Sequence, residues 1–106
     1  MKRIPQKNKI LRIVSSIVEQ CSPEKIILFG SHAYGKPNKD SDIDLFVVAK
    51  IPGLPAERIR VVRRAINEQA SVDVIVRNPE EVARALEGRD WFVKEIFEKG
   101  VVLYAR

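Results

Sequence analysis

Two aspartates separated by a single residue, Asp42 and Asp44, have the spacing in this sequence that most directly suggests chemistry. The run from Asp42 to Val48 predicts a strand, in which Asp42, Asp44, Phe46 and Val48 share one face and the two carboxylates lie about 7 Å apart. Like charges at that distance repel each other. Mg²⁺ is a common compensating ion, because it binds through one or two carboxylates together with substrate phosphates. The pair alone favours the alternative of a turn residue, Asp42, followed by a solvated edge acid, Asp44.

The Gly30-Ser31 turn is a second candidate feature, because it follows Lys25–Phe29, an apolar run typical of a buried strand. Glycine has no Cβ, so a phosphate group could approach the backbone there. Backbone N–H groups and the Ser31 hydroxyl could then donate hydrogen bonds to it. Gly-Ser after a strand is also a common turn, and the alternative of a purely structural role stays open.

A third acid, Asp73, interrupts the Val/Ile run from Ser71 to Val76. Valines alternate along one side of this predicted strand, whereas Asp73 and Ile75 face the other side. One strand therefore delivers an anion-binding turn, the next delivers two acids on one face, and the third delivers one more. The sequence predicts that three carboxylates and a phosphate-binding turn converge.

These residues must be positioned by helices that alternate with the strands. Apolar residues recur every three or four positions in Lys7–Cys21 and Leu54–Gln69, which predicts two amphipathic helices. Capping residues at Asn78 and Gly88 bound a third helix, and Trp91–Lys99 forms a fourth. This alternation predicts an α/β or α+β fold with a small mixed sheet of about four strands flanked by helices. The other predicted elements are the strands Lys25–Phe29, Asp42–Val48, Ser71–Val76 and Val101–Tyr104, and a loop over His32–Ser41 with one helical turn at Ser31–Tyr34.

Length and composition exclude several classes of protein. The 106 residues, of which 45% are apolar and 31% charged, are expected to form one domain, 1–106, with its core over about residues 7–104. The apolar runs are too short to cross a bilayer and the N-terminus lacks a signal-peptide core, so a cytoplasmic location is expected. The single cysteine, Cys21, cannot form an internal disulfide or a multi-thiolate zinc site. The net charge of +5 favours polyanionic ligands without choosing among them.

The two motifs together resemble a known family. Gly30-Ser-His-Ala-Tyr-Gly35 followed by Ser41-Asp-Ile-Asp-Leu45 resembles the Gly-Ser … Ser-Asp-x-Asp signature of the DNA polymerase β-like nucleotidyltransferase superfamily. The short length and compact motif look like its minimal nucleotidyltransferases, the antitoxin-like MNT domains. The resemblance covers nearly the whole chain and implies the polymerase β-like fold.

The resemblance also implies a site and a reaction. Asp42 and Asp44 would bind two Mg²⁺ ions, Asp73 would join them at the attacking hydroxyl, and Gly30 and Ser31 would hold the triphosphate of ATP. Two cations can lower the pKa of an acceptor hydroxyl and neutralise charge on the phosphates.

One position departs from the pattern, because many members have Arg after Gly-Ser where this chain has His32. A phosphate contact by that Arg is therefore not carried over. We interpret His32 as a solvated or capping side chain outside catalysis.

A domain of this size is expected to need a partner that supplies the acceptor. The minimal domains that this chain resembles are commonly paired with a small helical HEPN protein, an RNase-like toxin encoded by the adjacent gene. The resemblance implies transfer of AMP from ATP to a hydroxyl on that toxin, with tyrosine as the expected acceptor. Three alternatives remain, namely an antitoxin that acts by association alone, a small-molecule adenylyltransferase and a nucleic-acid-binding protein. The last ranks lowest, since no base-stacking motif or recognition helix accompanies the positive charge.

Two surfaces are candidates for contact with a partner. The apolar residues between Trp91 and Phe97 lie at helical spacing and belong either to the core or to an apolar contact. The arginines between Arg58 and Arg64 form either a solvated helix face or a basic contact.

Overall fold

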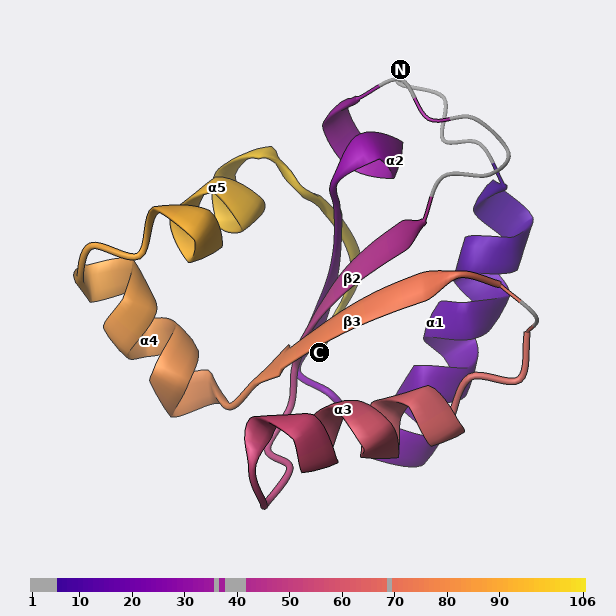
Figure 1. The fold of residues 1–106 in the computed structure, drawn as a ribbon, viewed down its shortest axis with the longest axis horizontal. Coiled ribbons are helices and arrows are strands. Elements are labelled where there is room, and N and C mark those ends of the chain that lie inside the picture. Colours follow the sequence, from indigo (N-terminus) through magenta and orange to yellow (C-terminus); the bar gives the residue numbers. More distant parts are fainter. Residues whose placement is uncertain (1–5, 36, 38–41, 69) are drawn as a thin grey trace.

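The computed structural model describes residues 6–35, 37, 42–68 and 70–106. Ser41 of the motif and Gln69, the predicted end of a helix, lie outside these ranges. Helices and strands alternate in the described chain as predicted (Figure 1). In order they are α1 (Lys7–Cys21), β1 (Lys25–Phe29), α2 (Ser31–Tyr34), β2 (Ile43–Val48), α3 (Pro55–Arg64), β3 (Val72–Arg77), α4 (Pro79–Glu87), α5 (Trp91–Lys99) and β4 (Val101–Ala105).

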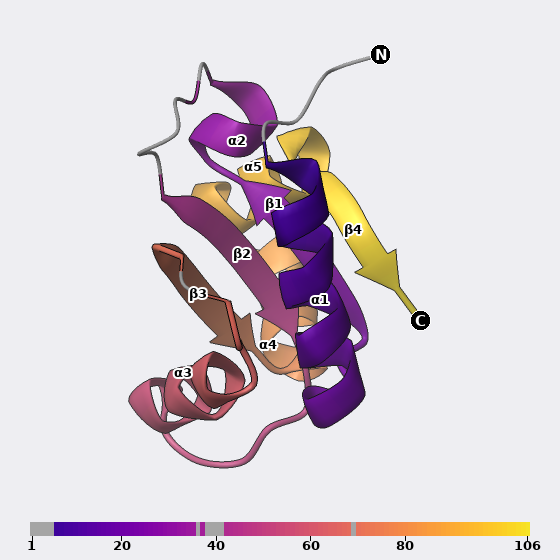
Figure 2. The same ribbon diagram turned by 90° about the vertical axis from the view of Figure 1, so that its right-hand side faces the viewer.

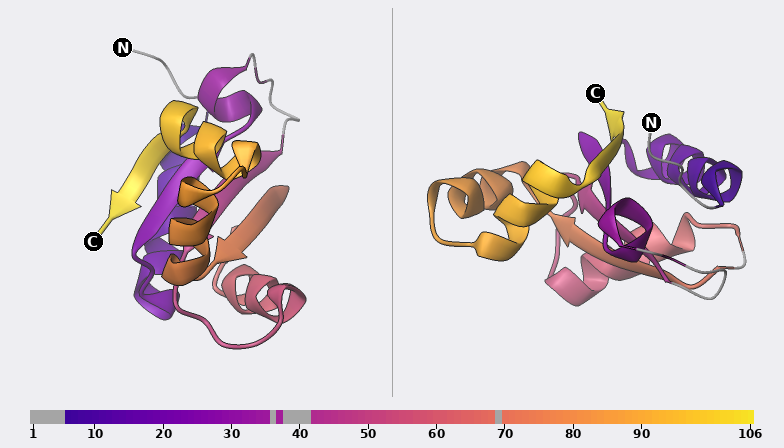
Figure 3. Two further views of the ribbon diagram at one scale, coloured as in Figure 1. Left: turned by 90° about the vertical axis from the view of Figure 1, so that its left-hand side faces the viewer. Right: turned by 90° about the horizontal axis from the view of Figure 1, so that it is seen from above.

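The four strands form one mixed sheet in the order β3-β2-β1-β4. β1 pairs antiparallel with both β2 and β4, whereas β2 and β3 run parallel and are connected through α3. Helices α1 and α3 cover one face of the sheet, which we call the back face, and α4 and α5 cover the other, the front face (Figures 1 and 3). This arrangement confirms the predicted fold class.

The back face holds the larger part of the apolar core. The apolar stripe of α1, which includes Ile13 and Ile17, packs on alternate strand residues such as Leu28 and Leu45, and all four are fully buried. Each such side chain contributes about 1.5–3 kcal/mol when it is removed from water. Because strand side chains alternate between faces, the same strands send their other residues to the front.

The front face is packed by aromatic side chains from the strands and from α5. The ring of Phe97 meets Phe46 edge to face, with ring centres 5.9 Å apart, and the ring of Phe92 meets Phe29 in the same way at 5.8 Å. Phe97 is partly buried, but Trp91 and Phe92 are 77% and 49% exposed. The predicted apolar stripe of α5 is therefore core at its C-terminal end and surface at its N-terminal end.

The largest error in a predicted boundary concerns the helix expected over Leu54–Gln69, which spans only Pro55–Arg64. The amide N–H groups of Ala65 and Ile66 bond three residues back, to the carbonyls of Val62 and Arg63, which tightens and closes the last turn. Neither glycine nor proline marks this end, so the sequence held no local stop signal.

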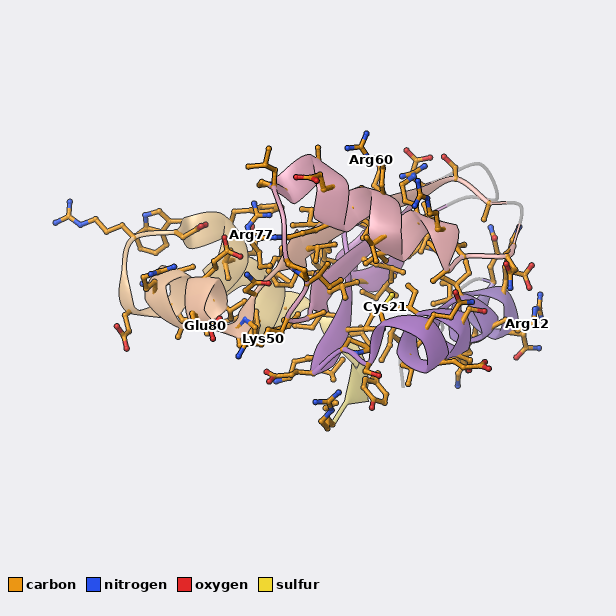
Figure 4. The ribbon with its side chains drawn as sticks, turned by 90° about the horizontal axis from the view of Figure 1, so that it is seen from below. Arg12, Cys21, Lys50, Arg60, Arg77 and Glu80 are labelled. Atoms are coloured by element: carbon orange, nitrogen blue, oxygen red, sulfur yellow. The ribbon has the colours of Figure 1, made fainter. Side chains whose placement is uncertain are left out.

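The arginine-rich face of α3 is only partly solvated. Arg58 donates to the Glu81 carboxylate at 2.7 Å and thereby ties α3 to α4, and Arg63 donates to the Val72 carbonyl at 2.8 Å. Arg60, by contrast, points away from the protein body (Figure 4). Arg58 is therefore an exception to the expected solvated helix face, because its side chain is only 12% exposed.

Cys21, the one cysteine of the sequence, lies half-buried at the end of α1 and packs against the back-face core (Figure 4). Burial raises the pKa of its thiol, so the thiol stays protonated at neutral pH. Across the described parts of the chain, none of the helices has the length and apolar character to span a bilayer.

Candidate functional site

The turn after β1 has a conformation that only glycine adopts readily. Gly30 has φ 73° and ψ −155°, a region in which other residues are strained. A Cβ at this position would overlap Oδ2 of Asp44 on the neighbouring strand. The Gly30 carbonyl then accepts the Tyr34 amide at 3.1 Å, so the chain turns directly from β1 into α2 (Figure 2). Glycine here therefore allows the turn to lie directly against a carboxylate.

The sheet register brings two of the predicted acids together. Asp44 is the cross-strand partner of Phe29 on one side and of Asp73 on the other. Paired residues point to the same face, so both carboxylates lie on the front face, near the end of β1 that carries the Gly30-Ser31 turn. Asp44 is half-buried and Asp73 is exposed.

Asp42 lies just before β2 rather than inside it. Its exposed carboxylate accepts a hydrogen bond from the Ser71 hydroxyl, and Ser71 lies just before β3. All three predicted acids thus lie on or beside the β2–β3 pair. Asp44 and Asp73 are in register within the strands, and Asp42 immediately precedes β2.

The three acids interact electrostatically. Burial raises the pKa of the Asp44 carboxyl, the negative charges of Asp73 and Asp42 raise it further, and the nearby His32 lowers it in part. Ionisation of the Asp44 carboxyl is therefore less favourable than that of a carboxyl in water. A cation bound beside it would remove this repulsion.

We tested whether these residues fit a divalent cation. Their donor set consists of carboxylate oxygens, which Mg²⁺ prefers. The pKa of Asp44 is raised by burial and then by the negative charges of Asp73 and Asp42, and a cation would balance those charges. In the described residues, however, no group of three or more His, Cys, Asp or Glu side chains is already gathered as a metal site. The acids thus fit Mg²⁺ by their chemistry, and the three-ligand site remains a prediction.

His32 is the residue that sequence reasoning assigned wrongly. It is 1% exposed, inside the short helix α2, and is not the solvated or capping side chain that we expected. A single helical turn leaves one side facing the sheet, and His32 falls on that side, close enough to Asp44 to affect its pKa. The helix-forming turn at Ser31–Tyr34, which the sequence does indicate, was the available signal.

Comparison with known proteins places the chain among nucleotidyltransferases. A family model described as a nucleotidyltransferase domain matches residues 7–104. The solved structure of a candidate nucleotidyltransferase from Sulfolobus solfataricus is 25% identical, with a TM-score of 0.66 over 93% of this chain and 79% of that one. A toxin–antitoxin crystal structure with AMP-PNP is 20% identical, with a TM-score of 0.55 over 95% and 74% of the two chains, and this likeness concerns the fold. No curated protein matches the sequence significantly.

The turn geometry predicts that Gly30→Ala lowers stability by about 1–3 kcal/mol, because alanine is strained at this φ and ψ. It should also displace the Asp44 carboxylate and change its titration. The matched control is Gly53→Ala, also at positive φ (104°), where the Cβ would lie 3.3 Å from the flexible Glu57 carboxylate. Thermal melts and NMR titration of Asp44 compare the two variants. An unchanged Asp44 titration in Gly30→Ala would contradict the close contact.

The electrostatics predict that Asp44→Asn raises the Tm in EDTA at pH 7, by a few degrees at most because the site is partly solvated. The pKa of Asp44 is higher in the folded than in the unfolded chain, so its ionisation costs folding free energy above that pKa. The cost vanishes as the pH falls below the ordinary Asp range, and the two Tm values should converge there. Added Mg²⁺ should stabilise the wild type more than the variant. A lower Tm for Asp44→Asn at pH 7 would refute the repulsion.

Proposed function

Because the chain belongs to the nucleotidyltransferase domain family, we propose that it is a Mg²⁺-dependent enzyme that transfers AMP from ATP to a hydroxyl group of a partner protein and releases pyrophosphate. One observation carries the proposal: Asp44 is in register with Asp73 and lies directly against the Gly30 turn. Carboxylates and a turn suited to phosphate, from three separate elements, thus meet at one end of the front face.

We assign the triphosphate to the Gly30-Ser31 turn. The absence of a Cβ at Gly30 leaves the backbone accessible, and the half-buried Ser31 offers a hydroxyl at the start of α2. Backbone N–H groups at the start of a helix have no partner within it, so the Ser31 amide can also donate to phosphate oxygen. Together these groups would orient the phosphates toward Asp44.

We assign Mg²⁺ binding to Asp42, Asp44 and Asp73. When bound, the metal would supply charge neutralisation at the α-phosphate and a lower pKa for the acceptor hydroxyl. In the strand order β3-β2-β1, Asp44 lies next to the turn and Asp73 lies one strand farther away. The acceptor hydroxyl would therefore approach from the β3 side, near Asp73, and the triphosphate from the β1 side.

We further propose that the acceptor is a tyrosine of a HEPN-type toxin encoded by the adjacent gene, with this chain as its cytoplasmic antitoxin. The fold likeness to a toxin–antitoxin structure supports a partner of this kind. The exposed Trp91 offers an apolar surface at the start of α5 for its contact.

The proposal predicts that Asp42→Asn and Asp44→Asn each reduce AMP transfer by at least about 100-fold. Each substitution removes a carboxylate ligand of the Mg²⁺ whose positive charge would neutralise the reacting phosphate. The chain would be co-expressed with the product of the adjacent gene and incubated with ATP and Mg²⁺. Mass spectrometry of that product should show the gain of one or more AMP units. Glu80→Gln is the control, because Glu80 is an exposed carboxylate of α4, near the opposite end of the sheet (Figure 4).

Persistent Mg²⁺-dependent transfer in the Asp42→Asn, Asp44→Asn double variant would exclude these residues from the site. A double variant that transfers no AMP and still neutralises the toxin would assign the biological effect to association. Transfer to small molecules alone would retain the enzyme and remove the antitoxin assignment.

Asp73 is expected to affect chemistry more than nucleotide binding, because it lies one strand farther from the proposed triphosphate turn. Asp73→Ala should slow single-turnover transfer by about 100-fold while the Kd for ATP changes by less than about threefold. Rapid-quench transfer and calorimetric ATP titration measure the two effects separately. Equal losses in both would contradict this role.

A further inference from the structure

An aromatic pair lies beside the candidate site on the front face. Phe29 is 8% exposed and is the direct cross-strand partner of Asp44, so both side chains lie on the same face. The ring of Phe92 packs against Phe29 with an interplanar angle of 88°, and yet Phe92 is 49% exposed. A phenyl ring anchored on the cross-strand neighbour of Asp44 therefore remains in contact with water.

The strand order shows on which side of Asp44 the aromatic pair lies. Asp73 flanks Asp44 on the β3 side, and Phe29 flanks it on the β1 side, where α5 crosses the front face. If the acceptor approaches near Asp73 and pyrophosphate leaves toward the Gly30-Ser31 turn, the nucleoside extends away from the sheet over the front face, where α5 carries Phe92. The flat, apolar face of a nucleobase matches an exposed aromatic ring in this position.

We propose that Phe92 stacks on the base of the bound nucleotide, an inference that rests on the proposed function and extends it. Stacking uses the π-face that every base possesses, so it strengthens binding without reading hydrogen-bond edges. The contact should therefore support ATP and GTP to similar extents. The buried Phe29 acts as a positioning residue, because its edge-to-face contact fixes the Phe92 ring.

The neighbouring Trp91 provides a matched control on the same helix. Successive helix residues point about 100° apart, so Trp91 and Phe92 occupy different sides of α5. The Lys94 ammonium lies 5.5 Å from the centre of the Trp91 ring, and Trp91 lines a shallow hollow of about 240 Å³ with Glu95 and Glu98. Trp91 is the more exposed aromatic residue of the two, and its ring meets the Lys94 ammonium, whereas the ring of Phe92 packs against Phe29.

The test compares four variants, Phe92→Ala, Phe92→Leu, Phe92→Tyr and Trp91→Ala, by calorimetric titration with ATP and with inorganic tripolyphosphate in Mg²⁺. Phe92→Ala and Phe92→Leu should weaken ATP binding about tenfold and leave tripolyphosphate binding unchanged. Phe92→Tyr keeps the aromatic face and should bind ATP like the wild type. Trp91→Ala should also bind ATP like the wild type, although it loses the larger aromatic ring.

Each result decides between distinct alternatives. Unchanged ATP affinity in Phe92→Leu, or equal losses of ATP and tripolyphosphate affinity, would overturn the stacking contact. A Phe92→Leu variant that binds ATP normally and transfers poorly would assign the ring to the acceptor instead. A wild-type chain that binds neither ligand would overturn the proposed function itself. If Phe92→Ala does not fold, Phe92→Leu and Phe92→Tyr, which retain most of the packing against Phe29, decide the question.

Discussion

The close approach of Gly30 to Asp44 is the constraint on which the candidate site depends. The half-buried Asp44 carboxylate lies between Gly30, where a Cβ would overlap it, and the carboxylate of Asp73, in register on the next strand. Burial and the charges of Asp73 and Asp42 disfavour the ionised form and raise the pKa of Asp44. The back-face core must therefore hold β2 and β3 together against the repulsion between their carboxylates. Buried strand residues such as Leu45 of β2 and Val74 of β3 provide that support.

The two faces of the sheet serve different purposes. The back face is covered by α1 and α3 and is filled by the aliphatic residues of the larger core cluster. The front face is covered by α4 and α5, whose buried side chains Val82, Val93 and Ile96 meet the strands below the acids. Alternation along each strand assigns residues to one face or the other, so a single run such as Ile43–Val48 supplies both core and charge.

Much of this could be predicted from the sequence, because periodicity and capping residues are local signals. The bounds of α1, β1 and α5 were predicted correctly, as was the common face of Asp73 and Ile75. The end of α3 is closed by backbone hydrogen bonds of Ala65 and Ile66 to carbonyls three residues back, and no residue type marks it. The burial of His32 and the exposure of Phe92 likewise depend on which side of a helix meets the sheet. Residue polarity alone predicted an exposed His32, which is wrong, and did not decide whether Phe92 belongs to the core or to the surface.

The connectivity of the sheet also implies an order in which the site assembles. β1 and β2 are consecutive antiparallel strands, so Gly30 and Asp44 meet by closing one short stretch of chain. Asp73 joins them only when β3 pairs with β2, and this parallel pairing closes a longer loop, which contains α3, at a greater entropic cost. β3 is also an edge strand, bonded to β2 alone among the described strands. Local opening at that edge would detach Asp73 while the Gly30–Asp44 contact stays intact. The Gly30–Asp44 part of the site is therefore expected to form first, and the Asp73 part to form later and to be lost more easily.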